Sequence, residues 1–387
     1  MDVSDPALYE RNRFHPLFRE LRARDPVHYC EDSAFGPYWA VTRYEDIVAV
    51  DTNHQDYSSR AGGISIFDSG VDDDSSFINM DPPEHQAHRG AVTPVFSSAN
   101  LAALEDEIRA RVAALLDRVP INEPFDWVAQ VADELPLQML GTLFGIPEED
   151  RYHMLYWTHA QVAIIGGQHG DRADATRHPS FSGYFRELRA RRAREQTLSP
   201  DLVSHLVQNQ SDLSDKKYLN HMRLLTVGAN DTTRTSIAGG LEAVVDQGLY
   251  QTLRDDPALI PTAVNEIIRF VTPVVHQRRT AMRDCELRGK QIRQGDKVVI
   301  FYVSGNRDER AFDSPDALVL DRSAPRILSF GSGIHHCIGF RLAKMQLEHM
   351  WAGMLARFSG FELVGPTERL RSNFVQGFKS MPVVARA

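Results

Sequence analysis

A single cysteine lies in a glycine-rich stretch near the end of the chain, Phe330-Gly331-Ser332-Gly333-Ile334-His335-His336-Cys337-Ile338-Gly339. Glycine allows positive φ angles and close backbone approach, so the stretch predicts a tight loop wrapped against a flat, bulky group. An amphipathic run begins at Ile338, and the N-terminus of a helix there would favour a thiolate at Cys337. A thiolate on a glycine loop, with no second cysteine nearby, suits a single axial bond to haem iron. The alternative is a cysteine that serves only as a small buried hydrophobic residue.

A second unusual stretch, Gly228-Ala229-Asn230-Asp231-Thr232-Thr233, lies in the middle of the longest predicted helix, 215–249. Small and β-branched residues are poor helix formers, and such a conflict between local sequence and predicted structure often marks function or strain. The hydroxyl of Thr232 can bond the carbonyl of Gly228 and loosen the helix. Small side chains at Gly228 and Ala229 would let a flat cofactor approach, and the pair Asp231 and Thr232 could relay protons beside it. A kinked core helix is the alternative.

Two further pairs of residues have helical spacing. His85 and Arg89 share one face of a helix that begins after Pro82 and Pro83, and two adjacent donors on one face could clamp an anionic group. A surface pair is the alternative. Glu266-x-x-Arg269 also falls on one helix face, but this pattern is weak by itself.

Helices and a few strands must position these residues. Apolar residues at three-to-four spacing, with start and stop signals, predict helices at 16–24, 44–50, 101–118, 127–144, 148–165, 179–196 and 215–249. Alternation and turn residues predict strands at 26–30, 38–42, 275–281, 286–287 and 297–302. The stretch 58–76 lacks periodicity and is either a substrate-facing lid or a solvated loop. A glycine-rich break at 166–171 is either a gate or an ordinary connector.

Composition restricts the class of protein. The chain has 387 residues, of which 42% are hydrophobic, enough for a large core and too few for a membrane protein. A net charge of −9 argues against nucleic acid as a partner. Three scattered cysteines indicate a reducing, cytoplasmic compartment. No stretch approaches the roughly eighteen apolar residues of a membrane span, and the polar N-terminus is unlike a signal peptide, so no membrane anchor is expected.

The pattern F-G-x-G-x-H-x-C-x-G at 330–339 matches the haem-binding signature of the cytochrome P-450 monooxygenases at every fixed position. The chain resembles this family along essentially its whole length. The resemblance implies a mainly α fold with small β-sheets, formed by a single domain over 1–387. The β-rich part would cover about 26–43 and 275–303, and the helical part about 84–270 and 338–358. The implied cofactor is haem b, with Cys337 as axial ligand to the metal and O2 as co-substrate.

The resemblance also implies a role for the weaker motifs. In the motif D-P-P-x-H-x-x-x-R, His85 and Arg89 would hold the haem propionates. The family pattern adds Arg279 and His335 as further propionate contacts. The oxygen-activation motif falls on 228–232, with Asp231 and Thr232 as catalytic residues. Ala229 stands where glycine is commoner, which would narrow the groove slightly. The predicted haem-binding residues are therefore Cys337, His85, Arg89, Arg279, His335, Gly228, Ala229, Phe330, Gly331 and Gly339. Glu266, Arg269 and Arg322 would form a buried structural charge network.

A narrower likeness concerns substrate. The runs at 35–39, 50–54, 289–293 and 303–309, with Asn230-Asp231-Thr232-Thr233-Arg234, resemble the soluble bacterial alkane and fatty-acid terminal hydroxylases. This implies omega hydroxylation of medium-chain n-alkanes or fatty acids, in an apolar channel that holds the terminal methyl nearest the iron. The candidates for that channel, any of which could equally be plain core, are Leu224, Leu225, Val274, Val275 and Phe374. Oxidation of a terpenoid or steroid, and non-catalytic haem binding, stay open.

The resemblance finally implies external electron transfer. No flavin or ferredoxin domain is fused to this sequence, so electrons from NAD(P)H are expected to arrive through an iron–sulfur ferredoxin and its reductase. Such a ferredoxin is usually acidic and should dock on the cysteine side, where Arg341 and Lys344 begin the following helix. The protein is expected to be a monomer whose other partner is an apolar small molecule.

Overall fold

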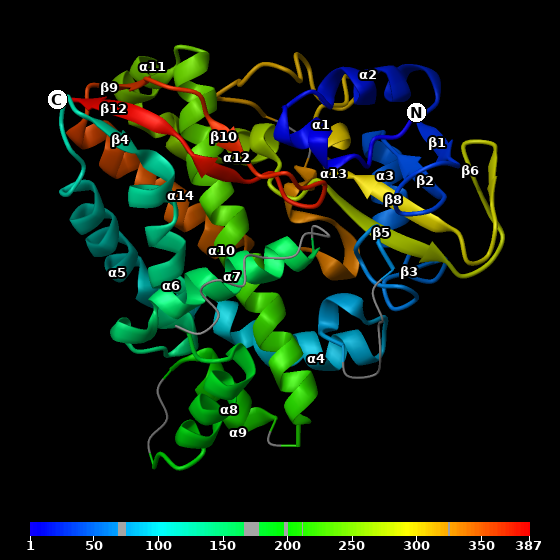
Figure 1. Ribbon diagram of the computed structural model, residues 1–387, viewed down its shortest axis with the longest axis horizontal. Coiled ribbons are helices and arrows are strands. Elements are labelled where there is room, and N and C mark those ends of the chain that lie inside the picture. The colour runs from blue at the N-terminus through cyan, green and yellow to red at the C-terminus, as the bar shows by residue number, and fades with distance from the viewer. Residues whose placement is uncertain (69–74, 166–177, 197–199, 211, 324–325) are drawn as a thin grey trace.

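Helices make up most of the structure, and most strands lie near the start and in the last third of the chain (Figure 1). The computed structural model describes residues 1–68, 75–165, 178–196, 200–210, 212–323 and 326–387. Its helices are α1 (Pro6–Glu10), α2 (His15–Arg24), α3 (Tyr44–Thr52), α4 (Glu84–Val92), α5 (Ser98–Leu116), α6 (Glu134–Phe144), α7 (Tyr152–Ile165), α8 (Phe181–Arg192), α9 (Leu202–Asn209), α10 (Asp215–Asp246), α11 (Tyr250–Asp255), α12 (Ile260–Val271), α13 (Tyr302–Gly305) and α14 (Phe340–Arg357). The expected mainly α architecture with small sheets is confirmed.

The main sheet has five strands in the order β1-β2-β8-β5-β3. Strand β2 is parallel to β8, and the other pairs are antiparallel. Three smaller sheets pair β6 with β7, β10 with β11, and β12 with both β4 and β9. The strands are β1 (Val27–Cys30), β2 (Tyr38–Val41), β3 (Tyr57–Ser58), β4 (Pro124–Asp126), β5 (His276–Ala281), β6 (Cys285–Leu287), β7 (Lys290–Ile292), β8 (Lys297–Phe301), β9 (Gly360–Leu363), β10 (Glu368–Arg369), β11 (Phe378–Ser380) and β12 (Pro382–Arg386).

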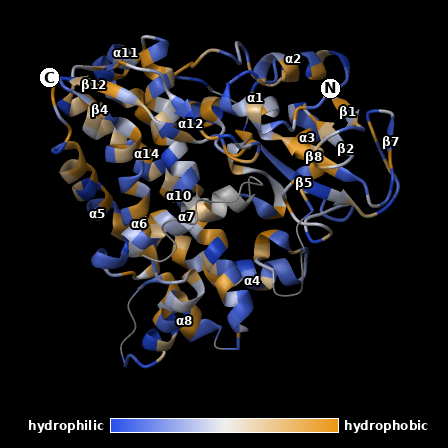
Figure 2. Cartoon of the chain, in the orientation of Figure 1, coloured by the Kyte–Doolittle hydropathy of each residue, from blue (hydrophilic) through white to orange (hydrophobic). Residues whose placement is uncertain are grey.

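The long helix α10 runs through the helical part of the molecule and contacts α6, α7, α8, α12 and α14 (Figure 1). Its side chains from Thr233 to Leu241 are all buried. Both α10 and the outer helices carry hydrophobic and hydrophilic residues, as Figure 2 shows. Apolar side chains of α5, α6, α10, α12 and α14 belong to one large core cluster, whereas two smaller clusters involve the main sheet. Burial of apolar surface in the large cluster therefore fixes the position of α10.

Most predicted helices form, with shifted ends. α5 begins at Ser98 because the side chain of Ser97 accepts a hydrogen bond from the backbone of Asn100. The helix predicted over 127–144 forms, but its first part, Val128–Ala132, is π-helical and precedes α6. A short 3-10 turn likewise separates 148–150 from α7. α10 ends at Asp246, just before Gly248 adopts a left-handed φ of 67°. The break at 166–171 lies outside the described residues.

The described part of the stretch 58–76 is attached to the main sheet. Arg278 donates its backbone N–H to the carbonyl of Ile64 at 2.8 Å, and Ile66 is buried in the same cluster as Val275. Residues 61–66 therefore lie along β5 as an ordered connection. The adjoining residues 69–74 lie outside the described part of the chain.

Candidate functional site

The cysteine loop connects β8 and α13 to the start of α14 and is as tight as its glycines predict. Gly331 and Gly333 have φ angles of 66° and 62°, in the left-handed region where glycine is favoured. A Cβ atom at Gly333 would lie 2.6 Å from the carbonyl oxygen of Asp51, so no larger residue fits there without movement. The backbone N–H of Cys337 donates to the carbonyl of Phe330 at 2.8 Å and closes the loop.

The surroundings of Cys337 suit a bound metal ion. Burial raises the pKa of the thiol, while the backbone N–H of Gly339 and the positive charge of Arg89 lower it. The side chain nevertheless keeps some accessible surface. Because a coordinated metal cation deprotonates a thiol outright, the N–H of Gly339 and the guanidinium of Arg89 would then stabilise the resulting thiolate.

The middle of α10 presents an open face beside its acid–alcohol pair. A Cβ atom added at Gly228 would meet nothing within 4 Å, so there is room there for a flat group. The hydroxyl of Thr232 donates to the carbonyl of Gly228 at 2.9 Å, as expected. α10 nevertheless continues through this stretch without ending. Ala229 packs, partly buried, against the edge of the large core.

Asp231 is buried, with only 2% of its surface exposed, and its Oδ2 atom has no hydrogen-bond partner among the described residues. Burial raises the pKa of this carboxyl to about 7; Arg234 opposes that shift and Asp133 adds to it. Arg234 lies 3.9 Å from Asp231 and donates hydrogen bonds to Asp133 and to the carbonyl of Phe378. Asp231 is therefore poised to gain or lose a proton near neutral pH.

The four residues expected at haem propionates lie together. The rings of His85 and His335 are 4.5 Å apart, and the charges of Arg279, Arg89 and His85 add to burial in lowering the pKa of His335. Burial, together with Arg89, likewise lowers the pKa of His85 to about 4. Neither nitrogen of either ring has a hydrogen-bond partner among the described residues. Two neutral imidazoles thus have ring nitrogens without a partner among the described residues, and Arg89 and Arg279 add positive charge beside them, so the cluster would suit an anionic group.

These features test the fit of haem. The thiol on the glycine loop matches the iron, and the open face on α10 matches the flat ring. The buried ring nitrogens without a partner among the described residues match the propionate groups. Two other residues predicted to contact haem, Gly331 and Gly339, shape the ends of the cysteine loop, and Phe330 packs against the edge of the large core. The donor set therefore fits the group that the sequence predicts.

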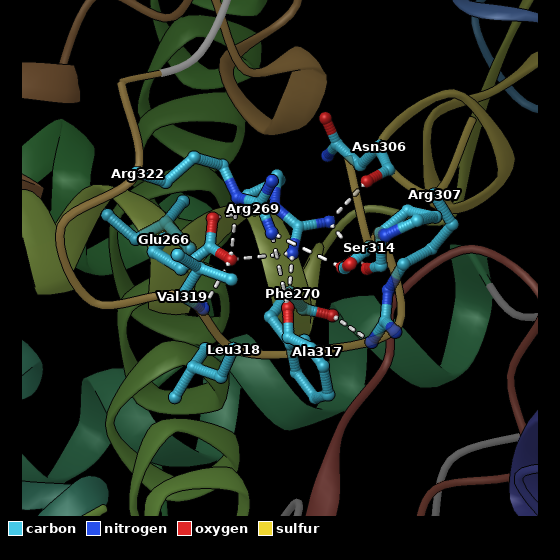
Figure 3. Close-up of polar contacts among 12 residues, drawn as sticks. Glu266, Arg269, Phe270, Asn306, Arg307, Ser314, Ala317, Leu318, Val319 and Arg322 are labelled. Carbon is cyan, nitrogen blue, oxygen red and sulfur yellow. Dashed lines mark hydrogen bonds and ion pairs between the residues drawn. The ribbon is translucent and has the colours of Figure 1, made fainter. Parts of the chain in front are cut away.

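The charge network lies between α12 and the segment that precedes the cysteine loop (Figure 3). Arg269 donates from Nε and Nη2 to the two carboxylate oxygens of Glu266, each at 2.7 Å, and Arg322 donates to Oε1 at 3.0 Å. Burial alone would raise the pKa of Glu266, but the hydrogen bonds and charge of Arg269, with the N–H of Val319 and with Arg322, hold it below its usual value. Arg269 also donates to the carbonyl oxygens of residues 306, 315 and 317, so all five N–H groups of its guanidinium have acceptors.

The channel candidates separate into two groups. Val274, Val275 and Phe374 are neighbours, because Val274 bridges Val375 and the N–H of Val275 donates to the carbonyl of Phe374 at 2.9 Å. Val275 has no accessible surface, which corresponds to the core alternative and leaves it unable to contact a ligand. Leu225 is buried and Leu224 half-buried on α10. Leu224 and Val274 therefore keep the accessible surface that a channel wall requires.

Sequence reasoning missed Asp51, Asp133 and Arg234. Asp51 is a buried carboxylate that accepts hydrogen bonds from Arg279, Tyr302 and Ser332. Asp51 lies one helical turn after Ile47 and so on the same, inward face of α3, which could have indicated a buried carboxylate. The predicted helix ended at Val50, so this position was not considered part of the helix. Arg234 falls within a run that resembles the terminal hydroxylases, but its pairing with Asp133 has no local signal, since the two meet only through packing of α10 against the π turn and α6.

Comparison with known proteins agrees with this geometry. The sequence pattern of the family described as "Cytochrome P450" matches residues 242–378. The chain is similar to linalool 8-monooxygenase of Pseudomonas putida, with 35% identity over 99% of this chain and 98% of the relative. It is also similar to the steroid C26-monooxygenase of Mycobacterium tuberculosis, with 30% identity over 99% of this chain and 92% of the relative.

The fold of this chain is also similar to that of a solved cytochrome P450 structure. Cytochrome P450-153 from Novosphingobium aromaticivorans is 38% identical and superposes with a TM-score of 0.90, over 100% of this chain and 99% of the other. Among the described residues, no helix has both the length and the apolar character that crossing a membrane requires.

Proposed function

Because this chain belongs to the cytochrome P450 family and is a monooxygenase, we propose that it hydroxylates the terminal carbon of medium-chain n-alkanes or fatty acids. Haem bound through a cysteine thiolate activates O2, so that one oxygen atom is inserted into a C–H bond. The observation that carries the proposal is the set of sequence runs, from Phe35-Gly36-Pro37-Tyr38-Trp39 to Asn230-Asp231-Thr232-Thr233-Arg234, that resemble the alkane and fatty-acid terminal hydroxylases.

The predicted site residues of this chain would have separate roles in holding the haem and in moving protons. Cys337 would hold the iron, while His85, Arg89, Arg279 and His335 would pair with the propionates. Gly228 and Ala229 would admit the ring next to α10. Asp231, whose pKa is about 7, would supply a proton from its Oδ2 atom, which has no partner among the described residues, and the Thr232 hydroxyl would relay it by taking one proton as it releases its own toward the reacting oxygen.

Position, more than affinity, is the requirement for terminal hydroxylation. Burial of an apolar chain contributes about 0.8 kcal/mol per methylene, so affinity for a medium-length chain is readily reached. The terminal C–H bond is stronger than its neighbours, so a narrow channel must hold the methyl group nearest the iron. Leu224 and Val274, which keep accessible surface, are the residues we assign to that channel, with Leu225 and Phe374 behind them.

We further propose that electrons come from NAD(P)H through a ferredoxin reductase and an acidic iron–sulfur ferredoxin. Arg341 is exposed and Lys344 half-buried in the first turn and a half of α14, directly after the cysteine loop. Their positive charges would attract an acidic partner to the face of the molecule next to the Cys337 loop.

Two measurements test the proposal. The reduced protein with CO should show a Soret band with the red shift of thiolate ligation; a band without that shift would refute Cys337 as the ligand. Turnover with surrogate ferredoxin and reductase should then yield 1-octanol from octane or 12-hydroxylauric acid from lauric acid. Ordinary thiolate spectra, combined with products from linalool or a sterol alone, would overturn the substrate assignment and leave the family unaffected.

A terpenoid or a steroid is the second candidate substrate. The names of two full-length relatives, a linalool 8-monooxygenase and a steroid C26-monooxygenase, favour it. Substrate-induced spectral titrations with lauric acid, octane, linalool and a sterol compare the classes directly, because only a ligand that enters the site displaces water from the iron.

A further inference from the structure

Asp51, the penultimate residue of α3, is a buried carboxylate that contacts two other parts of the site. Only 2% of its surface is exposed. Its Oδ2 atom accepts hydrogen bonds from the backbone N–H of Ser332 at 2.7 Å, the hydroxyl of Ser332 at 3.0 Å and the hydroxyl of Tyr302 at 3.1 Å. Its Oδ1 atom accepts from Nη2 of Arg279 at 2.6 Å. One side chain therefore connects α3 to both the cysteine loop and β5.

The backbone around Asp51 reinforces this connection. A Cβ atom at Gly333 would lie 2.6 Å from the carbonyl oxygen of Asp51 and 3.0 Å from the Cα atom of Thr52. The loop that carries Cys337 thus packs directly on the last turn of α3. Because Ser332 donates both its N–H and its hydroxyl to the same carboxylate, the loop is fixed in direction as well as in distance.

The charge of Asp51 also balances Arg279. The exposed fraction of Arg279 is 1%, and its other terminal nitrogen, Nη1, donates to the side chain of Gln277 and the carbonyl of Arg278. Asp51 is the carboxylate paired with this guanidinium among the described residues. Without it, the buried positive charge of Arg279, which helps to lower the pKa of His335, would be balanced only by the propionate groups assigned to it.

We propose that Asp51 is a positioning residue, which holds the Cys337 loop and Arg279 in place and sets the electrostatic environment of the iron. The inference rests on the proposed haem site at Cys337. A net positive charge near the iron stabilises the reduced state, because reduction adds an electron. Asp51 would therefore keep the reduction potential lower than Arg279 alone would.

The test compares isosteric variants of the purified, haem-loaded protein by spectroelectrochemical titration. Asp51→Asn keeps the size of the side chain and an acceptor for Ser332 but removes the charge. We expect the equilibrium constant for reduction to rise on the order of tenfold, which is about 59 mV for a one-electron couple. Ser332→Ala and Tyr302→Phe each remove one neutral donor and should change that constant less than about twofold. Equal potentials in Asp51→Asn and wild type would overturn the inference.

A second variant keeps the test decisive if Asp51→Asn does not fold. Arg279→Gln removes the positive charge and should lower the reduction potential. The double variant Asp51→Asn with Arg279→Gln removes both charges, so its equilibrium constant for reduction should lie within about threefold of the wild-type value. A double variant with the potential of Arg279→Gln alone would show that Asp51 has no electrostatic role. The CO spectrum of the wild-type protein reports separately on the haem site itself, so failure of the proposed function is distinguishable from failure of this inference.

Discussion

Replacement of Glu266 by glutamine removes the only negative charge from a network that contains two arginines. Arg269 has 0% and Glu266 2% of its side chain exposed, so solvent cannot replace the lost charge. The carboxylate accepts two hydrogen bonds from Arg269, one from Arg322 and one from the backbone N–H of Val319. Glutamine keeps one acceptor oxygen but turns an N–H₂ donor toward one of the arginine nitrogens.

The size of the effect follows from these contacts. Loss of one partner of a buried ion pair costs about 3–5 kcal/mol, because the remaining charge is left unpaired. Arg269 retains its bonds to the carbonyl oxygens of residues 306, 315 and 317, so we expect the lower half of that range, about 3–4 kcal/mol. The stability of a folded protein is about 5–15 kcal/mol, so Glu266→Gln should lose a large fraction of it.

The effect should also depend on pH in a defined direction. The pKa of Glu266 is lowered in the folded state, because its hydrogen bonds and the charge of Arg269 outweigh the opposing effect of burial. Stability from this group is thus present above the unfolded pKa, about 4.3, and is lost as pH falls through the folded value. The difference between wild type and Glu266→Gln should be full at pH 7 and should shrink below pH about 4.

Urea unfolding followed by circular dichroism measures both quantities. Glu20→Gln is the matched control, because Glu20 pairs with Arg24 on the exposed surface of α2, where such a pair is worth less than about 0.5 kcal/mol. A loss below about 1 kcal/mol in Glu266→Gln at pH 7, or a difference that does not change with pH, would refute the assignment of a charged structural network.

Three further predictions concern the site. Product formed per O2 consumed should fall as pH rises through about 7, because Asp231 loses its proton, and Asp231→Asn should abolish this dependence; an unchanged profile in the variant would exclude Asp231 as the donor. Gly333→Ala should destabilise the protein by at least about 2 kcal/mol in urea unfolding, whereas Gly289→Ala, with a similar φ but open space around it, should cost about 1 kcal/mol; equal losses would contradict the packing argument. Charge reversal at Arg341 and Lys344 should slow reduction by an acidic ferredoxin about tenfold at low ionic strength in stopped-flow measurements, and much less in high salt; unchanged kinetics would remove this docking face.

Chemistry that is contiguous in the sequence could be predicted, because its pattern is local. The cysteine loop and the Gly228–Thr232 stretch each place their functional groups within ten residues, and the Thr232 hydroxyl bonds Gly228 as helical spacing requires. Most strands and helices also followed from apolar periodicity and turn residues. The π-helical part of the helix predicted over 127–144 could not be predicted, because a π turn shifts the backbone without changing which residues are apolar.

Contacts between distant segments could not be predicted in this way. Asp51 and Ser332 are 281 residues apart in sequence, and Asp133 and Arg234 are 101 apart. A buried carboxylate and a surface carboxylate look alike in a sequence; only packing of α3 against the loop distinguishes them. Val275 illustrates a different limit, since a channel candidate is as readily a core residue in a sequence, and only its complete burial in the structure decides between the two.

Several locally unfavourable features of this chain lie around the cysteine loop and the middle of α10. An unpaired buried polar group costs about 1–3 kcal/mol, and the rings of His85 and His335 and the Oδ2 atom of Asp231 all have unpaired atoms. Left-handed backbone at Gly331 and Gly333 adds restrictions that most residues would not satisfy. Costs of this kind persist in natural proteins chiefly where a ligand or a reaction compensates them. A flat anionic cofactor between the cysteine loop and α10 would pair the two imidazoles and leave the carboxyl free to move protons, so a single bound group accounts for features that are separately unfavourable.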